Sequence, residues 1–278
     1  MAPEPRTGGW CRGRCRRAWP AVLTARRGAR HLVPGRRPVM EALRAGRRLH
    51  EVVLAGGRTR SAELDGIAAA ARLAGVTVRW ADTGELEALA EGVRHQGVVA
   101  LAPPYPYVGL QQVACGDLLV VLDGVTDPQN LGSIARSAEA AGAGGLVLPR
   151  RRSAHVTAAA EKASAGAFSW LPVALVANVS RALGDLGGVG FWTVGLTAGA
   201  QTSLWDSPLL GGRVALVVGA EGAGLSRLVD ERVDERLAIP MAGRLASLNA
   251  GVAAALVLFE VRRRRLALDR EAGGMPQD

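Results

Sequence analysis

The sequence predicts an α/β protein built on a parallel sheet, and three observations support this. Between residues 118 and 148, an apolar strand, a turn, a helix and a second apolar strand follow one another, an order that joins parallel strands. Apolar runs and helical patterns alternate on both sides of this unit. The stretch PPYPY at 103–107 interrupts the alternation, so we expect a small and a larger domain.

The small domain is expected over residues 31–102. Val39 and Leu43 indicate a short helix. Predicted strands cover 50–55, 76–80 and 97–101, and predicted helices cover 62–74 and the segment from Asp82 or Thr83 through Leu89. The apolar positions of the helix over 62–74 are Leu64, Ile67, Ala68, Ala71 and Leu73.

The larger domain is expected over residues 116–268, after a linker over 103–115. Strands are predicted at 118–122, 145–149, 171–176, 191–196, 213–218 and 236–240. The last helix should begin near Ser247 and run to about Leu266. Residues 269–278 are expected to form a flexible C-terminus. The two tyrosines of the linker, Tyr105 and Tyr107, are expected to pack against a domain.

Residues 1–30 have neither helical nor strand periodicity, and we expect a disordered basic tail. The net charge of the chain is +9, yet residues 1–37 hold ten arginines and one acid, Glu4. The rest of the chain is therefore balanced, and the basic pI does not by itself show that the folded part binds nucleic acid. An RNA-attracting arm, an organellar transit peptide and an over-long predicted start are the alternatives for this tail.

The cysteines are too few and too scattered for a disulfide framework. Cys11, Cys15 and Cys115 make an odd count, which favours a reducing compartment and a cytoplasmic location. Cys11 and Cys15 do not make a metal site without further ligands, so no metal is expected. No segment has the length and freedom from charge of a membrane span.

Three polar or glycine-rich stretches follow predicted strands: 123–142, 217–225 and 239–249. Ligands of open α/β sheets bind at the carboxyl ends of the strands, so these stretches are the candidate site. The first strand is not followed by G-x-G-x-x-G, and the chain has no G-x-x-x-x-G-K-[ST] loop. These absences argue against a dinucleotide-binding oxidoreductase and against a P-loop enzyme.

In this order the three stretches resemble the motifs of the SpoU (TrmH-type) RNA 2′-O-methyltransferases of the SPOUT superfamily. The likeness covers roughly residues 31–265 and begins near His31, which favours an over-long start as the origin of the tail. It is closest to the members that methylate a guanosine ribose of 23S rRNA. It implies S-adenosylmethionine as cofactor, structured RNA as substrate, a C-terminal trefoil knot and a homodimer paired through the knots. The small domain resembles the L30e/L7Ae-like RNA-binding domain of such enzymes.

The resemblance also implies roles for particular residues. It places Asn130, Arg136, Glu221, Ser247 and Asn249 in the catalytic site. From their positions alone, Asn130 and Ser247 are also candidate helix N-caps, and Arg136 is a candidate surface ion pair with Glu139. A guanidinium stays protonated in proteins, so we expect Arg136 to bind or stabilise charge rather than to act as a free base.

The cofactor-binding residues implied by the likeness are Thr197, Gly219, Gly222, Ile239, Met241 and Leu248. Three glycines within residues 219–224 let backbone approach a ligand closely. The chain departs from the family pattern at Ala250-Gly251, where relatives usually have valine and serine. That departure weakens any role for a hydroxyl at position 251.

The predicted RNA-binding residues are Arg36, Arg37 and Arg44, joined by Arg47 and Arg48 on a possible phosphate-contacting face. A solvated helix face is the competing interpretation. Other functions share these features: a tRNA methyltransferase, an antibiotic-resistance rRNA methyltransferase and a non-catalytic RNA-binding module are the alternatives.

Overall fold

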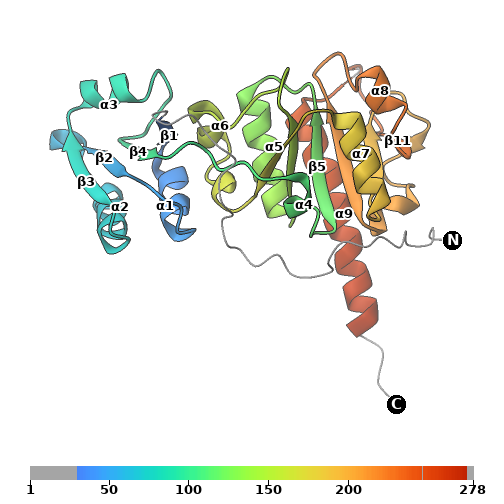
Figure 1. Ribbon diagram of the computed structural model, residues 1–278, viewed down its shortest axis with the longest axis horizontal. Coiled ribbons are helices and arrows are strands. Elements are labelled where there is room, and N and C mark those ends of the chain that lie inside the picture. The colour runs from blue at the N-terminus through green and yellow to red at the C-terminus, as the bar shows by residue number, and fades with distance from the viewer. Residues whose placement is uncertain (1–29, 246, 274–278) are drawn as a thin grey trace.

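The computed structural model describes residues 30–245 and 247–273, which form two α/β domains side by side (Figure 1). Of the predicted tail, residues 1–29 lie outside the described residues. Residues 274–278 of the predicted C-terminus lie outside them as well. The remaining part of that C-terminus, residues 269–273, is helical. The last helix therefore extends beyond its predicted end near Leu266.

The small domain contains a four-stranded sheet in the order β1-β4-β2-β3. Strand β4 is antiparallel to β1 and β2, and β2 is parallel to β3. Its strands are β1 His31–Pro34, β2 Glu51–Ala55, β3 Thr77–Ala81 and β4 Val98–Ala102, and its helices are α1 Arg36–Arg44, α2 Ala62–Leu73 and α3 Thr83–Leu89, with a 3-10 turn at Gly57–Thr59. The predicted elements are present, and β1 is an addition to them.

Local sequence explains the helix boundaries of this domain. Ser61 accepts a hydrogen bond from the amide of Leu64 at the start of α2, and Asp82 caps α3 through the amide of Glu85. Gly75, with φ +70°, follows the end of α2. The prediction for Leu73 was wrong: this side chain is 90% exposed, because it lies on the outer face of the last turn.

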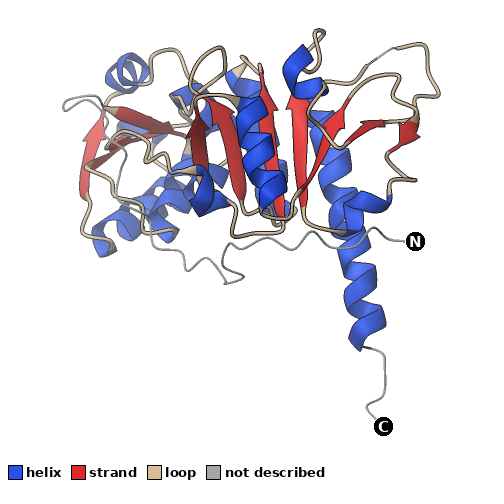
Figure 2. Cartoon of the chain, turned by 45° about the vertical axis from the view of Figure 1, so that its right-hand side comes forward, coloured by secondary structure: helices blue, strands red, loops and turns tan. Residues whose placement is uncertain are grey.

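The larger domain contains a seven-stranded sheet in the order β7-β6-β5-β10-β8-β11-β9, and every strand pair in it is parallel. Helices cover its faces (Figure 2). Its strands are β5 Leu118–Asp123, β6 Gly145–Pro149, β7 Val173–Val176, β8 Trp192–Leu196, β9 Thr202–Ser203, β10 Val214–Gly219 and β11 Glu235–Ala238. Its helices are α4 Leu110–Val113, α5 Pro128–Ala140, α6 Ala158–Ala163, α7 Val179–Gly188, α8 Arg227–Asp230 and α9 Ala250–Gly273, with 3-10 turns at Ala167–Ser169 and Pro208–Gly211.

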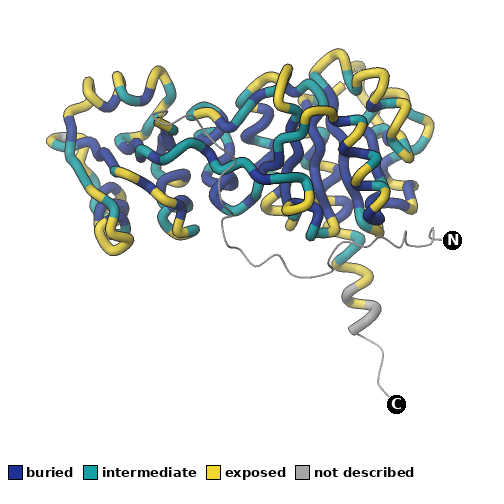
Figure 3. The backbone as a smooth tube through the Cα atoms, in the orientation of Figure 1, coloured by how far each residue is buried: buried dark blue, intermediate teal, exposed yellow. Residues whose placement is uncertain are grey.

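The central strands β5 and β10 are buried along almost their whole length (Figure 3). Buried strands covered on both faces read as continuous apolar runs, which is why their positions were predictable. Among the described residues, no helix is long and apolar enough to cross a membrane.

The starts of α5 and α9 differ from the predictions in their capping residues. Asp127 caps α5 through the amide of Gln129, with Pro128 in the first turn, so the N-cap assignment for Asn130 was wrong. Asn249 Oδ1 accepts from the amides of Gly251 and Val252 at the start of α9. The N-cap assignment for Ser247 was therefore wrong as well.

The predicted linker packs onto the larger domain instead of spanning free space. Tyr105 is buried and its hydroxyl donates to the carbonyls of Phe168 and Leu171. Tyr107 accepts a hydrogen bond from the amide of Val156, and burial raises the pKa of Tyr107 to about 12. Val108 pairs with β7 through Ala174. These contacts fix the point where the chain enters the larger domain.

Helix α5 lies between α6 and α9 and packs against both. Its contact with α6 is very close at Gly132. A Cβ built there would collide with the Cβ of Ala163 and lie 2.7 Å from the carbonyl oxygen of Ala160 and 2.8 Å from the amide nitrogen of Ser164. Two of these neighbours are backbone atoms, which cannot rotate away.

We predict that Gly132→Ala lowers the free energy of unfolding by roughly 1–3 kcal/mol, because the added methyl group forces α5 and α6 apart. The matched control is Gly66→Ala in α2, where the new Cβ meets nothing within 4 Å. That change should stabilise the protein by up to about 1 kcal/mol through helix propensity. Thermal melting of both variants measures this. A Gly132→Ala variant as stable as the control contradicts the close packing.

Candidate functional site

A hydrogen-bonded chain of three polar side chains lies at the carboxyl ends of β5 and β10. These strands are neighbours in register, with Gly219 opposite Asp123. Asn249 Nδ2 donates to Asn130 Oδ1 at 2.8 Å, and Asn130 Nδ2 donates to Glu221 Oε2 at 3.1 Å. The structure thus brings together one predicted catalytic residue from each of the three motifs.

The turn that carries Glu221 is closed by its own backbone. Ala220 and Gly224 exchange two hydrogen bonds of 2.9 and 2.8 Å, and a Cβ at Gly219 would collide with the carbonyl group of Gly224. Gly219 is therefore required by the turn itself. Gly222 has φ +78° and open space where a Cβ would lie. It is the exposed tip of the turn, where the backbone is accessible to a ligand.

The other predicted cofactor residues lie on neighbouring segments of the same sheet edge. Thr197 follows β8, the neighbour of β10, and its amide donates to Leu237. Its hydroxyl is buried without a hydrogen-bond partner among the described residues. Ile239 and Leu248 are half-buried, and Met241 is exposed. A buried orphan hydroxyl, an open glycine turn and accessible apolar side chains fit a ligand with polar and apolar parts.

Ser247 does not join the hydrogen-bonded chain. Its side chain is exposed and makes no hydrogen bond with another described residue. The nearby departure at Gly251 has a structural counterpart, because a Cβ at this position would collide with Ser133 Oγ. Ser133 donates to the carbonyl of Asn130. A hydroxyl from α5 thus occupies the space beside Gly251.

Arg136 lies apart from the hydrogen-bonded chain, about 9 Å farther along α5 than Asn130. It is exposed, and the predicted ion pair with Glu139 is absent from the described structure. It lines a cleft of about 810 Å³ between the two domains, together with Glu139, Trp170 and the predicted RNA-binding residues Arg36, Arg37 and Arg44. The structure therefore joins Arg136 to the basic residues of α1.

The arginines of this cleft differ in their partners. Arg36 pairs with Glu63 at 2.5 Å, and Arg44 pairs with Glu41 at 2.7 Å. The side chains of Arg37 and Arg136 form no hydrogen bond or ion pair with another described residue. Arg47 is not part of a phosphate-contacting face, because it is buried in an ion pair with Glu161 at 2.6 Å. The prediction for Arg47 was wrong.

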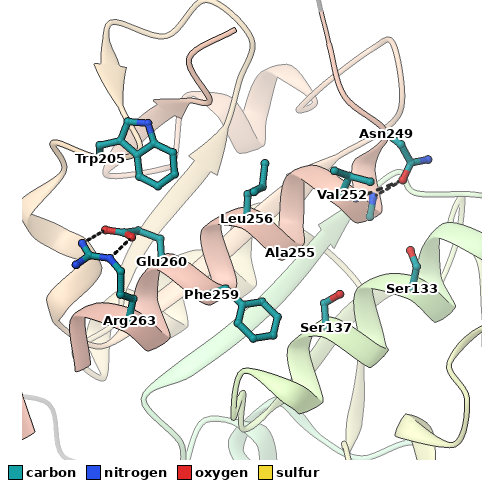
Figure 4. A pocket seen from close by; sticks show the side chains of 11 residues that line it. Ser133, Ser137, Trp205, Asn249, Val252, Ala255, Leu256, Phe259, Glu260 and Arg263 are labelled. Atoms are coloured by element: carbon teal, nitrogen blue, oxygen red, sulfur yellow. Dashed lines mark hydrogen bonds and ion pairs between the residues drawn. The ribbon is translucent and has the colours of Figure 1, made fainter. Parts of the chain in front are cut away.

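An apolar groove of about 680 Å³ lies between α9 and α5, on another face of the larger domain. Figure 4 shows Trp205, Leu256 and Phe259 around it, with Ser133 and Ser137 on the facing helix. Hydrogen bonds from Arg263 and Arg264 lower the pKa of Glu260, at the end of the groove, to about 2. Arg264 also donates to the carbonyls of Ser207 and Trp205, so it fixes the loop beside the groove.

The matches to family models place this fold, a parallel sheet whose carboxyl edge carries the site beside a small α/β domain, in the class of RNA methyltransferases. Residues 117–259 match the model of the SpoU rRNA Methylase family. Residues 32–108 match the model described as RNA 2′-O ribose methyltransferase substrate binding. The chain belongs to the SpoU rRNA methylase family.

Individual relatives agree with this assignment. An uncharacterized tRNA/rRNA methyltransferase of Mycobacterium avium is 42% identical over 243 residues, which cover 84% of this chain and 77% of the relative. The crystal structure of the SpoU methyltransferase AviRb from Streptomyces viridochromogenes with its cofactor AdoMet (S-adenosylmethionine) has a TM-score of 0.68 and 27% identity, covering 90% of this chain and 97% of that one. An AdoMet-bound rRNA methyltransferase from Sinorhizobium meliloti has a TM-score of 0.68 and 26% identity, covering 84% and 87%.

Sequence reasoning missed several residues that shape these surfaces. Ser133 lies within the first motif stretch, 123–142, but was not singled out there, and Trp170 lies outside all three stretches. The buried carboxylate of Glu161 is preceded by three alanines in the stretch 157–163, and no spacing pattern links it to Arg47, which is distant in sequence. The one feature of the sequence that could have singled out Trp205 is an aromatic residue within a polar loop.

We predict that Asn130→Asp destabilises the fold by about 1–3 kcal/mol at neutral pH. A carboxylate at position 130 cannot donate to Glu221, and two adjacent carboxylates repel each other. The repulsion raises the pKa of one carboxyl group of the pair formed by the new aspartate and Glu221. The loss of stability should therefore be greatest above that pKa. It should shrink as the pH falls and that carboxyl group takes up a proton. Melting temperature against pH measures this.

The control for this substitution is Asn178→Asp. Asn178 caps α7 through the amide of Arg181, and aspartate is an equally good N-cap, so stability should change little. An Asn130→Asp variant whose stability matches that of the control at neutral pH contradicts the observed network.

Proposed function

We propose that the protein transfers a methyl group from S-adenosylmethionine to a ribose 2′-hydroxyl of structured RNA, and that the target is a guanosine of 23S rRNA. The observation that carries the proposal is the chain Asn249–Asn130–Glu221, held beside an open glycine turn. The family assignment and the AdoMet complexes of its relatives support it.

The proposed cofactor site contains the turn around Gly219 and Gly222, Thr197, and the apolar side chains of Ile239, Met241 and Leu248. The orphan hydroxyl of Thr197 supplies a polar partner, and the apolar side chains cover the uncharged parts. The sulfonium group of the bound cofactor supplies the methyl group. The protein contributes by holding donor and acceptor in line, which accounts for much of the rate enhancement in such reactions.

The hydrogen-bonded chain positions the ribose. Glu221 uses Oε2 for Asn130, and its Oε1 has no partner among the described residues. That oxygen is an acceptor for a ribose hydroxyl proton, and the two asparagines fix its direction. Ser247, two residues before Asn249, is exposed, and in this proposal it offers a further hydroxyl to the substrate. Arg136 stays protonated and stabilises negative charge of the RNA.

The small domain and the cleft beside it bind the RNA strand in this proposal. Arg36, Arg37 and Arg44 line the cleft together with Arg136, and arginine side chains match the geometry of phosphate groups. The guanosine target in 23S rRNA rests on the likeness of the motifs. A tRNA target or an antibiotic-resistance target on rRNA is the alternative. Mapping of ribose methylations in rRNA and tRNA with and without the protein decides among them.

We also propose that α9 closes a trefoil knot and that the protein acts as a homodimer in the cytoplasm. Val252, Leu256 and Phe259 form an exposed apolar stripe along α9. Such a stripe on a helix is typical of a protein–protein contact. The free thiol of Cys115 agrees with a reducing compartment.

For the chemistry we predict that Arg136→Ala lowers the single-turnover methylation rate by roughly a hundredfold or more, with cofactor affinity nearly unchanged. Arg136→Lys should restore little, because a point charge does not replace a planar set of donors. Arg72→Ala is the control, since Arg72 is exposed on α2 outside the cleft. A folded Arg136→Ala variant with the control's rate removes Arg136 from the site.

For the homodimer we predict that Phe259→Asp converts the protein into a monomer, because the new charge would be buried in the interface. Sedimentation or light scattering gives the mass of each species. Leu228→Asp is the control, since this leucine is similarly exposed but lies on α8, outside the groove. A wild-type monomer, or a Phe259→Asp variant that remains a dimer, contradicts this part of the proposal.

A further inference from the structure

A buried ionic cluster joins the two domains. The carboxylate of Glu161, on α6 of the larger domain, is fully buried. Its Oε1 accepts a hydrogen bond from Arg47 Nη1 at 2.6 Å and lies 2.8 Å from His31 Nε2. Arg47 follows α1, and His31 begins β1, so both partners belong to the small domain. Residues 31, 47 and 161 therefore form a directional contact across the domain boundary.

The cluster is connected to the hydrogen-bonded chain by close packing. Helix α6 carries Glu161 and packs against α5 at Gly132, where no side chain fits. Asn130 lies two residues earlier on α5. The position of Glu161 is thus fixed relative to Asn130, without a flexible segment between them.

A tyrosine from the connecting segment supports the cluster. The guanidinium of Arg47 lies 5.3 Å from the centre of the Tyr105 ring, within the range of a cation–π interaction. Burial raises the pKa of Tyr105 well above its ordinary value, so its phenol stays protonated and donates to Phe168 and Leu171. Arg47 is held between the carboxylate and this ring.

Contacts at the rim connect the same two domains. Lys162 Nζ donates to Gln96 Oε1 at 2.5 Å, and Trp170 Nε1 donates to Glu41 Oε2 at 2.9 Å. Glu41 lies on α1, the helix whose arginines face Arg136 across the cleft. The relative position of the domains therefore determines the distance between these basic groups.

The cluster is a poor source of stability. Burial alone raises the pKa of Glu161, but Arg47 and His31 together hold it below its ordinary value, so the carboxylate is ionised at neutral pH. Glu161 Oε2 and Arg47 Nη2 are buried without a partner among the described residues. Their desolvation is therefore only partly offset, and buried ion pairs of this kind are often no more stable than apolar replacements.

We propose that Glu161 is a positioning residue for methyl transfer: through Arg47 and His31 it holds the substrate-binding domain at one place relative to Asn130 and Arg136. Apolar surfaces slide over one another at small cost, whereas a charged contact with fixed directions does not. The inference rests on the proposed function, because its consequence is measured in the methylation of RNA.

The experiment compares Glu161→Gln with the double variant Arg47→Met/Glu161→Met in the full chain. Glu161→Gln should lower kcat/KM for a structured rRNA fragment by roughly tenfold or more, with the Kd for S-adenosylmethionine unchanged. The double variant removes both charges and should recover a melting temperature close to that of the wild type, yet its kcat/KM should stay low. Small-angle X-ray scattering should show a wider range of domain positions in both variants.

Glu231→Gln is the matched control, since this glutamate forms an exposed ion pair with Arg227 and should leave all these quantities unchanged. A double variant that regains both the melting temperature and the wild-type kcat/KM overturns the positioning role. The effect of Glu161→Gln would then be explained by lost stability. An unchanged scattering profile in Glu161→Gln overturns it as well. If the wild-type protein transfers no methyl group to RNA, the proposed function fails, and the scattering profiles still decide whether Glu161 positions the domain.

Discussion

A buried side-chain amide needs hydrogen-bond partners for both its oxygen and its nitrogen. The candidate site depends on this constraint. Asn130 is 6% exposed and lies inside the first turns of α5. An unpaired buried amide costs about 1–3 kcal/mol, so its oxygen and nitrogen need partners from other segments. Asn249 supplies one partner and Glu221 the other. The two hydrogen bonds of Asn130 that define the site therefore also hold the loops after β10 and β11 against α5.

The same helix connects the site to the domain boundary. One face of α5 contacts α9 and the apolar groove, and Gly132 brings α6 into close contact on another side. Arg136 points to the cleft where the arginines of α1 lie. In the proposed function, a single rigid element thus relates the ribose-positioning chain, the RNA-binding cleft and the proposed dimer surface. Rearrangement of any one of these surfaces would require α5 to move.

The sequence was sufficient for the three loops of the site and for the strands other than β1 and β9, which are short. Buried parallel strands read as apolar runs, so the positions of β5 and β10 were predicted within a residue. The capping of α5 and α9 was not predicted, because several polar residues compete for each N-cap and the surrounding packing decides. The placement of Arg136 also could not be derived, since helical spacing gives its direction on α5 but not which domain it faces.

Long-range ionic contacts were the other failure of sequence reasoning. In the sequence, Arg47 looked like one of several surface arginines in and after α1. Its burial depends on Glu161, more than a hundred residues later. No local pattern distinguishes a buried arginine from an exposed one. The resemblance to the family supplied the roles of the motif residues but said nothing about this contact.

In the proposed function, methyl groups are transferred to the ribose and not to the base. The direct measurement uses RNA treated with the protein and S-adenosylmethionine carrying a labelled methyl group, followed by complete alkaline hydrolysis. Alkaline cleavage requires a free 2′-hydroxyl, so a methylated ribose protects the adjacent bond. If the proposed function holds, the label appears in alkali-resistant dinucleotides. Label in mononucleotides, which indicates a methylated base, would contradict it.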